Sequence, residues 1–161
     1  MEGGRFQVSQ DESKAVNIQP IGVVKNDVPD AEVPRRRAEM ISKIIIDDQW
    51  ADALTGIEEY SHLFVLFWMH KKPEMPVEQL LHPRGDKDLP LSGVLATRVR
   101  NRPNPIGMAV AELLNRNGNK LTVKRLDAFD GSPILDLKPY DDYDAVKSIQ
   151  VPEWWAKRCR K

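Results

Sequence analysis

Short apolar runs alternate with polar stretches containing proline, glycine and asparagine along most of this chain, a pattern typical of strands joined by turns. Residues 20–25 (PIGVVK) and 40–46 (MISKIII) are short and rich in β-branched side chains, so each predicts a strand. A third strand is predicted over 61–70 (SHLFVLFWMH), where both alternating sets of positions are largely apolar. Such a strand is expected to be covered on both faces.

The second half of the chain predicts further strands joined by tight turns. One is expected over 91–98 (LSGVLATR), and another over 134–140 (ILDLKPY), directly after a DGSP turn. Periodicity alone leaves 106–114 (IGMAVAELL) open between strand and helix. The Asn-Gly pair at 117–118 is a strong hairpin signal, and 121–129 beyond it is β-branched, so the two flanking segments are expected to pair as strands.

Few helices are expected. Apolar residues at helical spacing predict one short helix over 47–60, and a proline followed by tryptophans and basic residues predicts another over 152–159. Between 71 and 90 the chain is polar and interrupted by prolines, as in a long surface excursion. Six or seven strands with hairpin connections therefore predict a mainly β fold, an antiparallel β-barrel that leaves no open sheet edge.

Length and composition limit the kind of protein. The 161 residues suit one domain, and we expect a flexible polar leader over 1–16 followed by a barrel domain over 17–161. The longest apolar run, 63–69, is far shorter than the roughly 20 residues that a membrane-spanning helix needs, so no membrane span is expected. The 24 basic and 24 acidic side chains cancel, so no global field draws this chain onto nucleic acid.

Cysteine and histidine usage argues against a disulfide and against a metal centre. Cys159 is the single cysteine, which fits a cytoplasmic protein, and the 3 histidines lack metal-ligand spacing. The sequence contains no P-loop, no G-x-G-x-x-G after a strand and no G-x-S-x-G. NTPases, Rossmann dehydrogenases and α/β-hydrolases are therefore poorly supported.

The stretch TRVRNRPNPIG at 97–107 concentrates charge and stiff backbone. Arg98, Arg100 and Arg102 alternate, so they share one face if the preceding strand continues, with planar donors that suit carboxylate or phosphate. Two prolines stiffen the RPNPIG loop, which allows side chains on it to be aimed. The alternative interpretation is a solvated strand end with ordinary surface arginines.

Two other clusters have ordinary explanations when each is taken alone. The arginine triplet at 35–37 is typical of a solvated loop. The DGSP turn, followed by Asp136, Lys138 and Tyr140, places a carboxylate beside exposed backbone donors, and turns of this kind are common. A functional interpretation of this turn requires that it lie beside the arginine loop.

Taken together, five blocks of the sequence resemble one known family. They are PIGVV at 20–24, GIEEYSHLFVLFWMH at 56–70, HPRGD at 82–86, GVLATRVRNRPNPIGMAVAELL at 93–114 and DAFDGSPILDLKPY at 127–140. In order and spacing they resemble the TsaA-like (YaeB, TrmO) family in its short, single-domain form. The most specific part is ATR followed by RPNPIG, then D-G-[ST]-P and D-x-K-P-Y.

This resemblance implies an S-adenosylmethionine-dependent methyltransferase built on an antiparallel β-barrel. The family works as a homodimer, with S-adenosyl-L-methionine near the subunit interface, and methylates N6 of threonylcarbamoyl-adenosine at position 37 of tRNA. Carried over by position, the residues that the resemblance implies for binding the methyl donor are Pro34, Arg35, Arg36, Met69, His70, Lys71, Arg98, Met108, Asp130, Gly131, Ser132 and Pro133.

The acceptor side is less defined by the resemblance. Substrate contacts are expected from Arg100, Arg102, Asn104, Lys138 and Tyr140. The candidates for the group that accepts the proton are Asp130, Asp136 and His70, and the sequence does not choose among them.

This chain departs from the family pattern in two places. The family commonly has Ser-Pro between ATR and RPNPIG, whereas Val99, Arg100 and Asn101 stand here, and Ser132 replaces the usual threonine. Two alternatives to a tRNA methyltransferase therefore remain. One is a short paralogue that uses the same donor site to methylate a small molecule or another nucleophile, and the other is a barrel that binds the donor or RNA without turnover.

Overall fold

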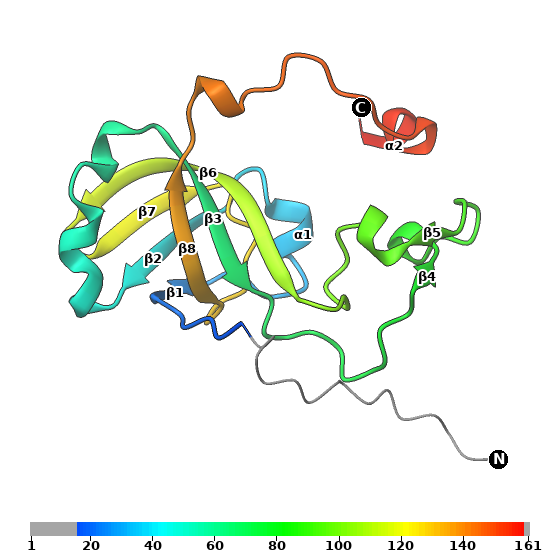
Figure 1. The fold of residues 1–161 in the computed structure, drawn as a ribbon, viewed down its shortest axis with the longest axis horizontal. Coiled ribbons are helices and arrows are strands. Elements are labelled where there is room, and N and C mark those ends of the chain that lie inside the picture. The colour runs from blue at the N-terminus through cyan, green and yellow to red at the C-terminus, as the bar shows by residue number, and fades with distance from the viewer. Residues whose placement is uncertain (1–15, 160–161) are drawn as a thin grey trace.

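The computed structural model describes residues 16–159, and six antiparallel strands of this part close into a barrel (Figure 1). The predicted antiparallel barrel is confirmed. All but the last residue of the predicted leader, 1–16, lies outside the described residues. In hydrogen-bonded order, with the last strand pairing back to the first, the strands are β1 (Gly22–Lys25), β2 (Ile41–Ile46), β7 (Lys120–Lys124), β6 (Ile106–Asn117), β3 (His62–Trp68) and β8 (Pro133–Pro139).

One alternating set of side chains from each strand fills the barrel interior. On β3 this set is Leu63, Val65 and Phe67, all buried. Phe67 pairs with Gly107 of β6, and a Cβ at Gly107 would collide with the Phe67 ring, so the glycine makes room for the aromatic side chain. The other set on β3, such as Phe64, is half-buried and faces outward. The expectation that β3 is covered on both faces is therefore wrong for the single chain.

The hairpin predicted at the Asn-Gly pair is confirmed. β6 and β7 pair across it, and Gly118 takes the left-handed conformation (φ +60°) that favours glycine. β7 ends at Lys124, earlier than the predicted 129, because Arg125 also has a positive φ of 70° and turns the chain out of the ladder.

Several short elements lie outside the barrel. The C-terminal helix predicted over 152–159 is confirmed, and it lies beside the ribbon formed by β4 (Leu80–Leu81) and β5 (Ser92–Gly93) (Figure 1). The guanidinium of Arg84, in the chain between these two strands, is 5.5 Å from the centre of the Trp155 ring. These elements are α1 (Val33–Arg36), β4 (Leu80–Leu81), the 3₁₀ turns η4 (Pro83–Gly85) and η6 (Asp142–Asp144), and α2 (Glu153–Cys159).

The strand predicted over 91–98 is wrong beyond its first residues. β5 (Ser92–Gly93) pairs with β4, and the chain then enters the 3₁₀ helix η5 (Val94–Ala96). The backbone N–H and the hydroxyl of Thr97 both donate to the Val94 carbonyl, at 3.2 and 2.8 Å. Because these bonds are local, no ladder forms, and the three arginines that follow do not alternate along one strand face.

The single helix predicted over 47–60 is also wrong. Two 3₁₀ helices, η2 (Asp48–Leu54) and η3 (Ile57–Glu59), stand in its place. Gly56 between them has a φ of +86°, which interrupts the helical hydrogen-bond pattern. Among the buried side chains, this segment contributes Leu54 to the core.

Candidate functional site

The end of β3 and the turn before β8 lie against each other. Nδ1 of His70, two residues after β3, is 3.3 Å from Oγ of Ser132. The Met69 N–H donates to the Pro105 carbonyl at 2.8 Å, which ties the same end of β3 to the RPNPIG loop. Three motifs that the sequence separates, MHK, DGSP and RPNPIG, therefore meet at one end of the barrel.

Gly131 gives the DGSP turn its shape. Its φ is +79°, and its N–H donates to the Val24 carbonyl at 2.9 Å, while the Ser132 N–H donates to the Phe129 carbonyl at 3.1 Å. A Cβ placed at Gly131 would lie 3.9 Å from Nε2 of His70, an ordinary contact. The backbone of the turn therefore requires glycine, and the imidazole lies over it.

Asp130 is held by the end of β1. Its Oδ1 accepts the Asn26 N–H at 3.1 Å, and its Oδ2 lies 3.7 Å from Nζ of Lys25. The Asn26 side chain also donates to the Ala128 carbonyl at 3.2 Å. Asn26 thus anchors the approach to the turn, although sequence reasoning treated it only as part of an NDVPD turn. The sequence feature that could have identified Asn26 is its position in a turn, because asparagine side chains often form hydrogen bonds with nearby backbone groups there.

Burial, together with a neighbouring cation, favours the neutral form of His70. Partial burial of the ring is the main cause that lowers the pKa of His70 below its ordinary value of 6.5, and the adjacent Lys71 ammonium lowers it further. The carboxylates of Asp30 and Asp130 act in the opposite direction. Asp30 also accepts from Nζ of Lys71 at 2.8 Å, which fixes the lysine beside the histidine. Sequence reasoning did not single out Asp30.

Arg98 and Met108 are joined directly. The Arg98 guanidinium donates to the Met108 carbonyl at 2.9 Å, and Met108, 51% exposed, pairs across the ladder with Leu66 of β3. The Arg102 guanidinium donates to the Thr97 carbonyl at 3.1 Å and so braces the loop from within. Met108 lies on β6, the strand next to the one that delivers the histidine, and Arg98 reaches the same strand from the segment after η5.

The Pro-Arg-Arg segment is more loosely attached. Arg36 pairs with Glu32 of the same helical turn at 3.4 Å. Within residues 16–159 no hydrogen bond or ion pair joins Pro34, Arg35 or Arg36 to the DGSP turn. This segment reaches the site through Asp30, which lies just before it in the chain.

The remaining expected substrate residues are spread along the outer face of β8 and the RPNPIG loop. Asp136 and Lys138 form an ion pair at 2.8 Å, and this hydrogen bond and charge raise the pKa of Lys138. The Tyr140 ring contacts Phe64 edge to face, with 5.2 Å between ring centres. The Asn104 carbonyl accepts the N–H two residues further on at 2.7 Å. Within residues 16–159, no hydrogen bond or ion pair joins Lys138, Tyr140 or Asn104 to the DGSP turn.

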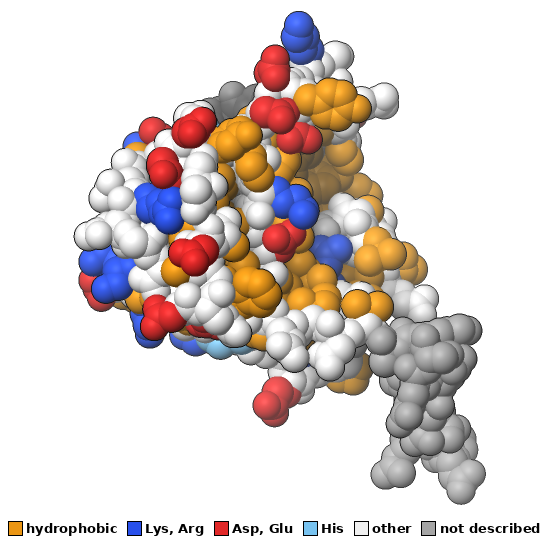
Figure 2. Space-filling model, turned by 60° about the vertical axis from the view of Figure 1, so that its left-hand side comes forward, with side chains coloured by type: hydrophobic (Ala, Val, Ile, Leu, Met, Phe, Trp, Pro, Cys, Tyr) orange, Lys and Arg blue, Asp and Glu red, His pale blue; other side chains and the backbone are white. Residues whose placement is uncertain are grey.

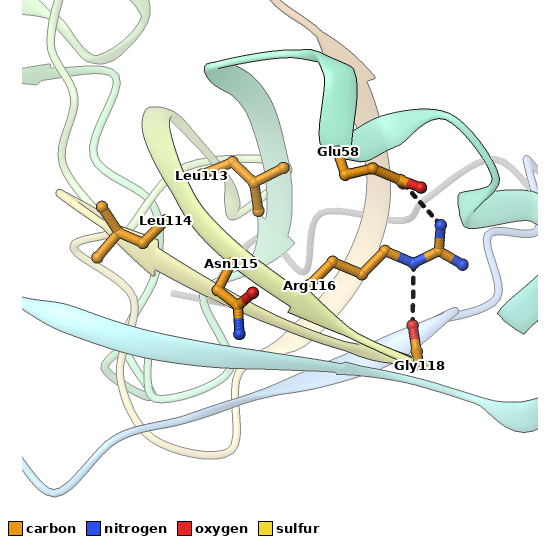
Figure 3. A pocket seen from close by; sticks show the side chains of 6 residues that line it. All are labelled: Glu58, Leu113, Leu114, Asn115, Arg116 and Gly118. Carbon is orange, nitrogen blue, oxygen red and sulfur yellow. Dashed lines mark hydrogen bonds and ion pairs between the residues drawn. The ribbon is translucent and has the colours of Figure 1, made fainter.

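A separate hollow of about 400 Å³ lies at the far end of β6 (Figure 3). Met108 and Arg116 stand at opposite ends of this strand, roughly 25 Å apart at about 3.3 Å per residue. The Arg116 guanidinium is engaged by the Leu54 carbonyl at 2.8 Å and by Glu58 at 2.7 Å, a pairing that contributes to lowering the pKa of Glu58 after its backbone hydrogen bond. The hollow is lined by Glu58, Leu113, Leu114, Asn115, Arg116 and Gly118, none of them a candidate site residue.

Among the described residues, none of the helices has the length and the apolar character that a membrane span requires. Equally, no group of three or more histidine, cysteine, aspartate or glutamate side chains in the part of the chain that the structure describes is arranged to hold a metal ion.

Residues 23–145 match the family described as the tRNA-methyltransferase O N-terminal domain, and this chain belongs to that family. An S-adenosyl-L-methionine-binding protein of Archaeoglobus fulgidus is 39% identical over 137 residues, which cover 83% of this chain and 96% of the relative. The family expected from the sequence motifs is therefore confirmed.

Longer relatives are matched over part of their length. A mouse tRNA (adenine(37)-N6)-methyltransferase is 37% identical over 103 residues, which cover 62% of this chain but 23% of that enzyme. A crystal structure of TrmO superposes with a TM-score of 0.70 at 29% identity, covering 85% of this chain and 63% of the TrmO chain. The barrel is thus the fold of TrmO, and this chain spans less than two thirds of that solved chain.

Proposed function

We propose that this chain binds S-adenosyl-L-methionine at the place where the end of β3 meets the DGSP turn. The observation that carries this proposal is the contact between His70 and Ser132, with the imidazole lying over Gly131. It joins two of the motifs that the family resemblance assigns to the donor. The naming of the Archaeoglobus relative as an S-adenosyl-L-methionine-binding protein supports the same ligand.

The residues present fit the chemistry of this ligand. The cations Lys71 and Arg98 suit its carboxylate, and the exposed side chain of Met108 offers an apolar cover for an adenine ring. Asp130 accepts hydrogen bonds from ammonium or ribose hydroxyl groups, and Gly131 lacks a side chain that would hold a ligand away from the backbone. For Arg35 and Arg36, donor binding rests on the family resemblance. The contact between their loop and the site is made by Asp30, which accepts from Lys71.

We further propose that the chain is a methyltransferase acting on N6 of threonylcarbamoyl-adenosine at tRNA position 37. When bound, S-adenosyl-L-methionine supplies an electrophilic methyl group on a sulfonium. The protein is then required to hold the donor and the acceptor in line and to exclude water, so no covalent nucleophile is needed. The match to a mouse enzyme named for adenine 37 of tRNA supports this substrate.

We propose that the proton acceptor is a residue of the DGSP turn or its neighbour His70, and not Asp136. Asp136 is engaged by Lys138 on the outer face of β8 and pairs across the ladder with Leu66. Asp130 and His70, by contrast, both lie at the DGSP turn. We assign the proton acceptor to one of these two, and Asp136 to a place outside the reacting centre.

We also propose that two copies of this chain associate through the outer face of β6, β3 and β8. Met108 and Val110 of β6 are 51% and 37% exposed, and they lie beside half-buried Phe64 and Leu66 of β3. Apolar patches of this kind are common at interfaces. Figure 2 shows hydrophobic side chains gathered on one face of the molecule, with charged side chains set among them.

A second candidate function is methylation of a small molecule at the same donor site. It is favoured by the triplet Val99, Arg100 and Asn101, which stands beside the donor motif where the resembling family commonly has Ser-Pro. The two candidates share the donor and differ only in the acceptor.

One series of experiments separates these possibilities. Calorimetry with S-adenosyl-L-methionine tests donor binding, and Arg98→Ala is expected to abolish it. Labelled methyl groups are then followed with tRNA that contains threonylcarbamoyl-adenosine and with tRNA that lacks it. Incorporation only into the modified tRNA supports the first function, and label only in a small-molecule fraction supports the second. Absence of donor binding by the unaltered chain overturns both.

A further inference from the structure

One aromatic ring beside the DGSP turn carries two cations. The guanidinium carbon of Arg100 lies 4.6 Å from the centre of the Phe129 ring, and Nζ of Lys71 lies 5.7 Å from it. Phe129 directly precedes the turn, and its carbonyl accepts the Ser132 N–H at 3.1 Å. The ring therefore joins the loop after η5 to the end of β3 at the edge of the proposed donor site.

The two cations differ in how far their charge is compensated. Lys71 is paired with Asp30 at 2.8 Å. Arg100 is exposed, and within residues 16–159 it forms neither an ion pair nor a hydrogen bond. A guanidinium that lies on an aromatic ring uses its flat face for that contact and keeps its N–H donors at the edge. Arg100 thus offers an oriented, uncompensated set of donors to a ligand.

We propose that Arg100 binds a phosphodiester group of an RNA acceptor, and that Phe129 is the positioning residue that holds it beside the donor turn. This inference rests on the proposed function for the class of acceptor. Arg98 is engaged by the Met108 carbonyl, whereas the donors of Arg100 are open.

The test measures RNA binding directly, without methyl transfer. Fluorescence anisotropy of a labelled anticodon stem-loop RNA is followed on the full chain at several salt concentrations. Arg100→Ala is expected to weaken binding roughly five- to tenfold and to reduce the salt dependence by about one ion. Phe129→Leu is expected to weaken binding about two- to fivefold, because the arginine loses its platform. The double variant is expected to match Arg100→Ala.

Controls keep the result specific to this pair. Arg84→Ala removes another arginine that lies on an aromatic ring, at the β4–β5 ribbon, and is expected to leave RNA affinity within twofold. Phe129→Tyr keeps the ring and is expected to retain affinity, which separates loss of the platform from loss of folding. Inorganic phosphate, added at matched ionic strength, distinguishes a site for a free phosphate ion from a site for RNA. It is expected to displace the labelled RNA only if Arg100 belongs to a site for the free ion.

Several outcomes would overturn the inference. They are unchanged RNA affinity in Arg100→Ala, additive losses in the double variant, displacement by inorganic phosphate, or a tenfold loss of S-adenosyl-L-methionine affinity in Phe129→Leu with RNA binding intact. The proposed function fails separately. If the chain binds RNA through Arg100 but transfers no methyl group, the role of Arg100 stands and the proposed methyltransferase function fails. If Arg100→Ala methylates RNA as well as the unaltered chain, the function stands and the role of Arg100 fails.

Discussion

Oγ of Ser132 lies 3.3 Å from Nδ1 of His70, across 62 positions of sequence. Ser132 is 1% exposed, so its hydroxyl hydrogen depends on the histidine for a partner. Because an unpaired buried donor is costly, we expect the hydroxyl to donate to Nδ1, which leaves the proton of the neutral imidazole on Nε2, over Gly131. His70 then donates a hydrogen bond to a ligand on the turn, and Asp130 is the expected proton acceptor.

Removing the serine hydroxyl is expected to weaken both the fold and the site. Ser132→Ala should lower the free energy of unfolding by about 1 kcal/mol in urea titrations and lower the affinity for S-adenosyl-L-methionine, because the imidazole loses its orienting partner. Ser132→Thr keeps the hydroxyl and should retain affinity. Ser42 is the matched control, since its buried hydroxyl has no partner in the structure. Ser42→Ala should cost no stability, and equal losses in the two alanine variants would contradict this account.

Two glycines with positive φ separate the effect of strain from the effect on the site. Gly131→Ala and Gly118→Ala should each lower the free energy of unfolding by about 1–2 kcal/mol, because an L-residue is strained at φ +79° and +60°. Only Gly131→Ala should also weaken donor binding, since its new methyl group faces His70, whereas Gly118 has no neighbour within 4 Å. Calorimetric titration of both variants checks the difference, and equal donor affinity would remove Gly131 from the site.

The lowered pKa of His70 gives a stability term with a defined sign. The unfolded chain, at the ordinary value of 6.5, takes up this proton before the folded chain does. The contribution of His70 to stability is therefore complete above pH 6.5 and is lost as the pH falls from 6.5 through the lower, folded pKa. An NMR titration of His70 should show a midpoint below 6.5, which Lys71→Ala should raise. A wild-type midpoint above that value would refute the assigned causes.

The proposed association of two copies depends on the outer face of β6. Val110→Lys places a charge opposite Phe64 on that face and should convert a dimer to a monomer, because a charge buried without a partner is costly. Sedimentation velocity distinguishes the two states. Lys43→Ala, at an exposed position of β2, is the control and should leave the dimer intact. A wild-type chain that sediments as a monomer at all concentrations tested rules out the dimer.

The sequence predicted the barrel because its strands carry strong local signals. β-branched runs, the Asn-Gly hairpin and the prolines identify β1, β2, β3, β6 and β8 with ends displaced by at most three residues. The predicted strand over 91–98 and the predicted helix over 47–60 were wrong because local backbone geometry and hydrogen bonds interrupted them. Thr97 bonds back to Val94 and ends a predicted strand, and Gly56 divides a predicted helix. An apolar pattern does not reveal which backbone partner is chosen.

The sequence motifs named candidate site residues but did not show which of them would be in contact. The motifs indicated His70, Arg98 and the DGSP turn, and the barrel closure brings the histidine and the turn into contact. Asn26 and Phe129 were missed as supporting residues, because their contacts are made across more than 25 positions of chain. Such pairings follow from strand order, which periodicity does not encode.

The barrel is closed by a short seam. β1 and β8 share two residue pairs, Gly22 with Ile134 and Val23 with Pro133, whereas β3 and β6 share seven. The DGSP turn lies directly beside this seam. Across it, the Val24 N–H donates to the Ser132 carbonyl and the Gly131 N–H donates to the Val24 carbonyl. A contact between residues so distant in sequence carries a high loop-closure cost, so opening of the seam dismantles the site. Any ligand that binds the folded turn therefore also stabilises the pairing of β1 with β8, and this stabilisation grows with the ligand's concentration and affinity.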